Sequence, residues 1–177
     1  MTTQRCASRG PEEETKNDMG QKITPCLWFN GQAEEAANYY ISIFKNAEML
    51  DVSRYGEGAP FPAGTALVAN FKLDGIAFTA LNGGPEFTFD EAISFQIDCA
   101  DQAEVDYYWE KLTAEGGEES QCGWLKDKFG VSWQVVPAAI AQLMSTDNPA
   151  KAGAVMQALF KMQKIDIATL QAAYDAA

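Results

Sequence analysis

Residues 23–34 read ITPCLWFNGQAE, and residues 93–104 read ISFQIDCADQAE, at an offset of 70 positions. Each copy has a short apolar run, a polar turn, and then Gln-Ala-Glu, which opens a helical pattern with adjacent aromatic residues. A solenoid needs a shorter period and more copies. The repeat therefore predicts two halves of one duplicated domain.

Hydrophobic periodicity extends the repeat beyond these dozen residues. In the first half it predicts a strand at 23–29, a helix at 32–44, and strands at 48–55, 65–73 and 76–81. Asp74-Gly75 lies between the last two, and this dipeptide is a strong hairpin signal. The second half repeats the order with a strand at 93–99, a helix at 102–114, and strands at 118–121, 124–126 and 131–136. We expect an α+β fold of two tandem β-α-β-β-β modules, at 21–88 and 89–137.

The two ends of the chain differ from this domain. Residues 1–20 are polar, without the apolar segment of a signal peptide, and we expect an N-terminal extension whose order the sequence does not predict. Residues 138–177 lack strand signals and predict a tail of short helices at 138–144, 149–162 and 166–174. Their apolar face should pack on the domain or on a partner subunit.

Composition narrows the classes of function. The 177 residues have a net charge of −12, which argues against nucleic acid and anionic membranes as partners. The sequence contains no histidine, and this excludes Ser-His-Asp and Cys-His catalysis. The four cysteines have no metal or redox spacing, so we expect reduced thiols in a cytoplasmic protein.

Several longer phrases resemble one known family. ITPCLWFNGQAEEAANYY, FTALNGGPEF, GGEESQCGWLKDKFGVSWQVVP and KIDIATLQAAY are similar to PhnB-like proteins, over about residues 21–175. That group bears the domain name 3-demethylubiquinone-9 3-methyltransferase and resembles the vicinal oxygen chelate superfamily of glyoxalase I and bleomycin-resistance proteins. The resemblance implies the duplicated fold and a homodimer.

The resemblance also implies where a metal would bind. Superfamily enzymes hold a divalent metal at four strand positions, which correspond here to about Thr24, Phe78, Ala92 and Gln134. None is a histidine or a carboxylate, although Glu91 is adjacent to Ala92. We therefore predict no metal of this type and no cofactor. No glycine-rich turn of Rossmann type opens a helix, which disfavours methyl transfer.

Strand alternation predicts a ligand cavity on one face of the sheet. The parity of the superfamily implies that the cavity face comprises Cys26, Trp28, Ala80, Asn82, Ser94, Gln96, Ser132, Gln134 and Val136. Cys122 is expected near the mouth, and Trp124 is a candidate for the cavity wall. Amides among apolar side chains suit a small organic molecule. Alternatively, Asn82 and Gln96 satisfy buried backbone groups, Cys122 is an inert thiol, and the tryptophans belong to the core.

The loop GGPEFTFDEA contains three carboxylates and suggests a catalytic base. Glu86 and Asp90 are the candidates, since the neighbouring phenylalanines could raise a carboxyl pKa. A solvated loop is the alternative. Three functions stay open: a small-molecule binding protein without a metal, an enzyme of unknown reaction on a small metabolite, and a methyltransferase.

Overall fold

The structure is a computed structural model that describes residues 21–177, so the predicted N-terminal extension lies outside the described residues. The first module contains β1 (Cys26–Phe29), α1 (Ala33–Ile43), β2 (Ala47–Arg54), β3 (Ala66–Leu73) and β4 (Ile76–Asn82). Its sheet has the strand order β1-β4-β3-β2, in which β1 is parallel to β4 and the other pairs are antiparallel.

The second module repeats this topology. It contains β5 (Phe95–Cys99), α2 (Gln102–Thr113), a 3₁₀ turn (Ala114–Gly116), β6 (Glu118–Glu119), β7 (Trp124–Lys126) and β8 (Ser132–Pro137). The strand order is β5-β8-β7-β6, and β5 is parallel to β8. The predicted pair of β-α-β-β-β modules is therefore confirmed.

Local sequence explains the boundaries of these elements. Asp74 and Gly75 have φ values of 47° and 81°, as a two-residue hairpin with both central residues left-handed requires. Helix α2 begins where the Asp101 carboxylate accepts a hydrogen bond from Glu104 N (3.0 Å). In return, the Glu104 carboxylate accepts one from Ala100 N (2.9 Å), which resembles a capping box.

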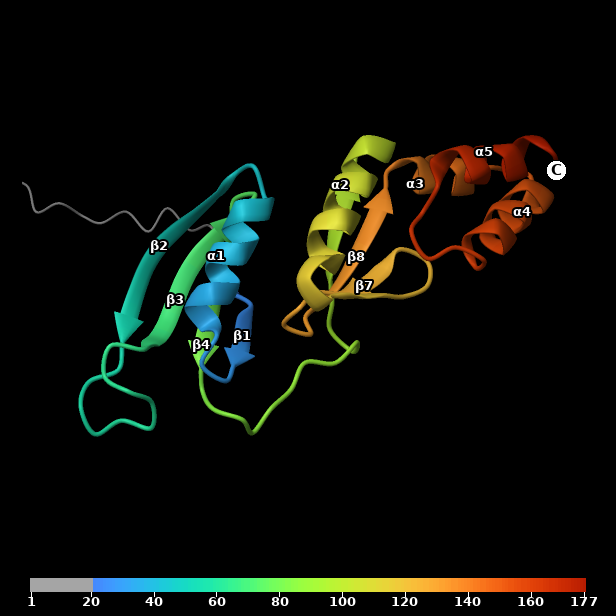
Figure 1. Ribbon diagram of the computed structural model, residues 1–177. Coiled ribbons are helices and arrows are strands. Elements are labelled where there is room, and N and C mark those ends of the chain that lie inside the picture. The colour runs from blue at the N-terminus through green and yellow to red at the C-terminus, as the bar shows by residue number, and fades with distance from the viewer. Residues whose placement is uncertain (1–20) are drawn as a thin grey trace, which may run out of the picture.

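The two modules share one hydrophobic core, to which α1 contributes its buried face. Tyr40 of α1 packs against Trp133 of β8 with ring centroids 5.5 Å apart. Figure 1 shows the modules side by side with α1 and α2 next to each other. Two tyrosine hydroxyls join the helices: Tyr39 donates to Lys111 O (2.6 Å) and Tyr107 donates to Ile43 O (2.8 Å).

The tail forms three helices, α3 (Ala139–Met144), α4 (Pro149–Leu159) and α5 (Ile167–Asp175), which lie beyond the second module in Figure 1. They enclose a small core of their own around Val155 and Leu170. The apolar face of α4, predicted to pack on the domain or on a partner subunit, instead packs against the other tail helices. Within residues 21–177, no helix is both long and apolar enough to span a membrane.

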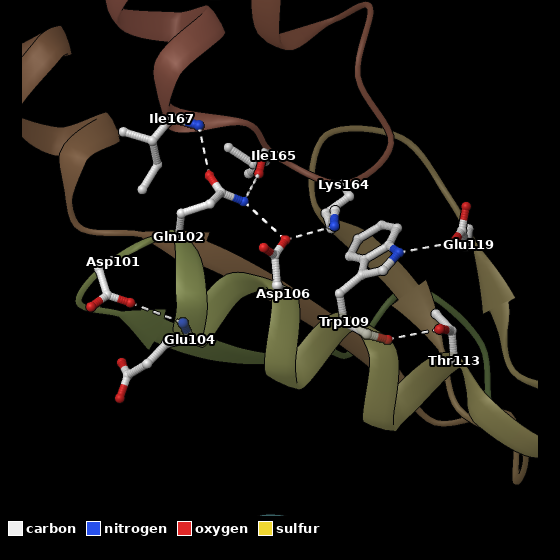
Figure 2. A network of polar contacts seen from close by, with 10 residues as sticks. All are labelled: Asp101, Gln102, Glu104, Asp106, Trp109, Thr113, Glu119, Lys164, Ile165 and Ile167. Carbon is white, nitrogen blue, oxygen red and sulfur yellow. Dashed lines mark hydrogen bonds and ion pairs between the residues drawn. The ribbon is translucent and has the colours of Figure 1, made fainter.

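The tail is held to α2 by a polar network (Figure 2). The Gln102 side-chain amide donates to Ile165 O (3.1 Å) and accepts from Ile167 N (2.9 Å), and so holds the loop that leads into α5. Lys164 pairs with Asp106 at 2.6 Å, and hydrogen bonds to Lys164 and Gln102 hold the Asp106 pKa below its usual range. The network fixes the tail to the second module.

Candidate functional site

Strand register decides which side chains share the face of the first sheet opposite α1. Cys26 lies opposite Thr79, and Trp28 lies opposite Leu81, so these four side chains point to the same side. Ala80 and Asn82 are partners of Leu27 and Phe29, which belong to the core beneath α1. The prediction that Ala80 and Asn82 share the cavity face with Cys26 and Trp28 was therefore wrong by one residue on β4.

Asn82 has a structural role at this position. Its side chain is fully buried; the amide oxygen accepts from Ala33 N (3.0 Å), and the amide nitrogen donates to Ala66 O (2.8 Å). Ala33 is the first residue of α1, whose N-terminal N–H groups need acceptors. Asn82 thus links β4 to the start of α1 and uses both ends of its amide there.

The second sheet has the predicted parity. Gln96 lies opposite Gln134, and Gln134 lies opposite Trp124, on the face away from α2. Gln134 donates to Ser94 Oγ at 2.9 Å, and Gln96 donates to Asp98 at 2.7 Å. Both amide groups thus donate hydrogen bonds to β5 or to the residue just before it.

A polar row on the first sheet was missed by the sequence interpretation. Thr79 donates to the Asn70 amide oxygen (2.8 Å), and the Asn70 amide nitrogen donates to both Asp51 carboxylate oxygens (3.1 and 3.2 Å). The row crosses β4, β3 and β2 beside Cys26. The alternation in Val68-Ala69-Asn70 could have predicted it, had the register of β3 been known.

The candidate site is an apolar cavity beside β1, here called the Cys26 cavity. It has a volume of about 410 Å³, within the range of small-molecule sites. Its lining comprises Pro25, Cys26, Leu27, Thr88, Phe89, Asp90, Ile93, Phe95, Val131 and Ser132. The connection between the modules supplies one wall, and the start of β8 supplies another.

Three predicted residues line this cavity: Cys26, Asp90 and Ser132. Cys26 is exposed, and burial of part of its surface raises the pKa of the thiol, which disfavours the reactive thiolate. Asp90 contributes the carboxylate in the cavity lining, and this carboxylate accepts a hydrogen bond from Ala92 N at 3.0 Å. That contact forms a local turn at the entrance to β5.

The other predicted site residues lie elsewhere. Cys122 and Trp124 line a second cavity of about 490 Å³, and Ser94 and Gln96 line a third of about 590 Å³. Trp28 donates its indole N–H to Gly84 O (2.9 Å) and packs edge-on against exposed Phe87. Glu86 is exposed and lines none of the three cavities, nor does Gln134.

Cys122 is fixed by the tail. It has a φ of 60°, a strained value for a residue with a side chain. Its N–H donates to Met162 O (2.8 Å), and its thiol lies 3.6 Å from Leu159 O. Cys122 therefore helps to attach the tail to the second module.

Comparison with known proteins gives the family. The family model described as 3-demethylubiquinone-9 3-methyltransferase matches residues 21–136. The chain belongs to this family. Among solved structures, a protein from Bacillus cereus described as a putative 3-demethylubiquinone-9 3-methyltransferase, PhnB protein, is 38% identical with a TM-score of 0.62. The match covers 67% of this chain and 100% of that one.

Two further solved structures are less similar in sequence. Protein PA1353 from Pseudomonas aeruginosa is 24% identical with a TM-score of 0.54, over 65% of this chain and 96% of that one. A glyoxylase/bleomycin resistance protein/dioxygenase domain from Frankia sp. EAN1pec is 16% identical with a TM-score of 0.43, over 64% and 88% of the two chains. No curated protein matches the chain. The PhnB-like family, which the sequence predicted, is confirmed.

The superfamily resemblance implies a metal site at four strand positions, and the side chains at these positions can be compared with the ligands that a metal needs. Internal symmetry equates Thr24 with Ser94, so the predicted position Ala92 was wrong by two residues. Through the strand registers it equates Thr79 with Gln134. Phe78, predicted at one of these positions, is 6% exposed and packs in the core under α1. Thr24, Thr79, Ser94 and Gln134 offer neutral oxygen and amide groups. Transition metals prefer imidazole, thiolate or carboxylate ligands, so the side chains at these four positions do not fit such a metal.

Proposed function

We propose that this PhnB-like protein binds a small, largely apolar organic molecule in the Cys26 cavity. The observation that supports the proposal is the composition of the cavity wall. Leu27, Phe89, Ile93, Phe95 and Val131 provide apolar surface. The polar groups are few and suited to fixing the orientation of a ligand: Thr88, Asp90 and Ser132.

Charge argues against an anionic ligand in this cavity. Asp90 disfavours an anion, and the cavity lining contains no lysine or arginine that would offset it. A neutral molecule with one hydrogen-bond donor could use the second oxygen of Asp90 while its apolar part contacts Phe89 and Phe95. This arrangement matches the common design of small-molecule sites.

The proposal is tested by thermal-shift screening of small neutral metabolites, with and without divalent ions. Binding in the Cys26 cavity predicts hits whose stabilisation does not depend on the ion. Cys26→Trp, at an exposed position, should fill the cavity and abolish those shifts. The matched control is Glu110→Trp, which places the same side chain at an exposed site on α2. Cys122→Trp is unsuitable as a control because it would disturb the contacts with the tail. Hits that persist in Cys26→Trp would contradict the proposal.

An enzyme is the second candidate, favoured by the position of Asp90 in the cavity wall. A base there could remove a proton from a bound substrate, while Glu86, outside the cavities, would act only if its loop moved onto the ligand. Once a ligand is known, Asp90→Asn should lower turnover at least about a hundredfold if Asp90 is the base. Unchanged turnover would remove Asp90 from catalysis.

The methyltransferase function rests on the family description alone. The turn between β1 and α1 is Asn30-Gly31-Gln32. It lacks the G-x-G-x-x-G pattern with which Rossmann-type enzymes bind their nucleotide cofactors. Calorimetry with S-adenosylmethionine tests this function directly. Specific binding would favour it over the neutral-ligand proposal.

A further inference from the structure

The third cavity lies between the modules, where the end of α1 and the β3–β4 hairpin meet β5 and α2. We call it the intermodule cavity; its volume is about 590 Å³. Of the residues that line the intermodule cavity and the Cys26 cavity, Phe95 alone is common to both. The intermodule cavity is therefore a separate place for a ligand.

Aromatic rings form the wall of the intermodule cavity. They are contributed by both modules: Phe44, Phe78, Phe95, Tyr108 and Trp133. Ring centroids lie 5.2 Å apart for Phe44–Tyr108, 5.7 Å for Phe44–Trp133, 5.4 Å for Phe95–Trp133 and 5.2 Å for Phe78–Phe95. The face of an aromatic ring is electron-rich and attracts cations.

The rim of the cavity is acidic. Asp74, Asp98 and Glu104 line it together with one lysine, Lys45. The ion pairs within residues 21–177 use other carboxylates, so these three are not neutralised by a paired lysine or arginine. Negative charge beside aromatic surface disfavours anions and favours a positively charged group.

The hydroxyl group of Tyr108 is a second observation, separate from the acidic rim, that favours a ligand in this cavity. The residue is 8% exposed and lines the cavity, and no hydrogen bond joins its hydroxyl to another described residue. Since no fully buried polar side-chain atom among the described residues lacks a partner, this hydroxyl keeps some accessible surface, on a side chain that lines the cavity. Burial first, and then the charges of Asp74 and Glu104, raise the pKa of Tyr108 to about 12, so it stays a neutral donor.

We propose that the intermodule cavity binds a small organic cation, a quaternary or protonated amine with an apolar or hydroxylated arm. The ammonium group would lie among the aromatic rings and face Asp74 and Glu104, and the Tyr108 hydroxyl would meet a polar arm. The net charge of −12 also raises the local concentration of cations. This site is additional to the Cys26 cavity and does not depend on it.

Choline and its neutral isostere 3,3-dimethylbutan-1-ol test the proposal, because they differ in charge at nearly constant shape. In calorimetric titrations we expect choline to bind at least about tenfold more tightly than the alcohol. The Tyr108 ring resonances should shift in NMR spectra during the choline titration. Absence of choline binding, equal binding of the alcohol, or an unperturbed Tyr108 ring would each overturn the proposal.

A charge-matched pair of double variants locates the site. Asp74→Asn with Glu104→Gln removes two rim charges; asparagine tolerates the left-handed φ of residue 74, and glutamine keeps an acceptor for Ala100 N. Choline affinity should fall at least about tenfold. Glu110→Gln with Asp147→Asn removes two exposed charges outside the cavity lining and should change it less than about twofold.

Two outcomes of this comparison overturn the proposal. One is an equal loss in both double variants, which would indicate a general effect of net charge. The other is unchanged affinity in the rim variant with an unfolding midpoint like that of the wild type. Cys26→Trp should leave choline binding intact, so failure of the Cys26 cavity and failure of the intermodule cavity are distinguishable.

Discussion

Asp127 holds a buried carboxylate at the junction of the two modules. It is 2% exposed and accepts hydrogen bonds from Tyr40 Oη (2.8 Å), Trp133 Nε1 (2.8 Å), Phe129 N (2.9 Å) and Val131 N (3.1 Å). Burial raises the pKa of Asp127, although all four hydrogen bonds favour the charged form. The folded protein therefore retains this proton more strongly than the unfolded chain does. The contribution of Asp127 to stability falls as pH rises from the usual carboxyl pKa through the folded value.

Tyr40→Phe tests the junction at the scale of one hydrogen bond. The variant removes a donor to the charged form, so we expect the free energy of unfolding to fall by about 1.5–3 kcal/mol near neutral pH. The loss should be smaller at about pH 4, where more of Asp127 is protonated. Urea unfolding at the two pH values measures both effects.

Tyr39→Phe is the matched control. Its hydroxyl donates to Lys111 O at an exposed position, and its pKa of about 12, raised chiefly by burial, places its titration outside the tested range. We expect a smaller loss that does not change with pH. A Tyr40→Phe loss that is equally independent of pH would show that Asp127 does not carry the effect.

At the scale of the element, the tail depends on the Gln102 side chain (Figure 2). Gln102→Ala removes the acceptor of Ile167 N and a donor to Ile165 O. We expect hydrogen exchange at the Ile167 amide to accelerate about tenfold, because each bond contributes roughly 1 kcal/mol. Exchange at Cys122 and Gly123, which donate to Met162 O and Gln163 O, should accelerate as well.

Gln171→Ala serves as the control for this prediction. Gln171 is exposed and bonds within α5 to Asp175 at 2.9 Å, so the tail contacts with α2 stay intact. Exchange at Cys122 and Gly123 should not change in this variant. If Gln102→Ala leaves those two amides protected, the tail does not depend on the Gln102 bridge.

The elements themselves were largely predictable. Most strand and helix bounds follow from periodicity and turn signals. Asn148, a typical capping residue, accepts from Ala150 N before Pro149 begins α4. The strands at 23–29 and 93–99 are shorter than predicted, as β1 begins at Cys26 and β5 at Phe95. Ile23 and Ile93 precede them and are 85% and 74% exposed. Apolar character alone does not distinguish a strand residue from an exposed approach to a strand.

The site was less predictable than the elements. The face of a side chain depends on strand register, and a shift of one residue on β4 moved Asn82 from the cavity to the core. Cys26 and Asp90 do meet in one cavity, whereas Ser94 and Cys122 line two others. Such groupings depend on how the modules pack, and alternation within a single strand carries no information on that packing.

At the scale of the whole molecule, we predict a homodimer. Ile23, Phe87 and Ile93 are each more than 60% exposed, and large exposed apolar side chains commonly mark an interface. Light scattering should give twice the mass of the 19.3 kDa chain. Phe87→Lys should shift the equilibrium toward the monomer, whereas Phe160→Lys on the tail should not. A monomeric wild type at high concentration would contradict this prediction.

The central claim is that the Cys26 cavity binds a small neutral organic molecule, and native mass spectrometry tests it most directly. The protein is titrated with the strongest hit of the ligand screen, in parallel with Cys26→Trp. The account predicts one ligand bound per wild-type chain and none per Cys26→Trp chain. Equal occupancy of the two proteins, or none in the wild type, would contradict it.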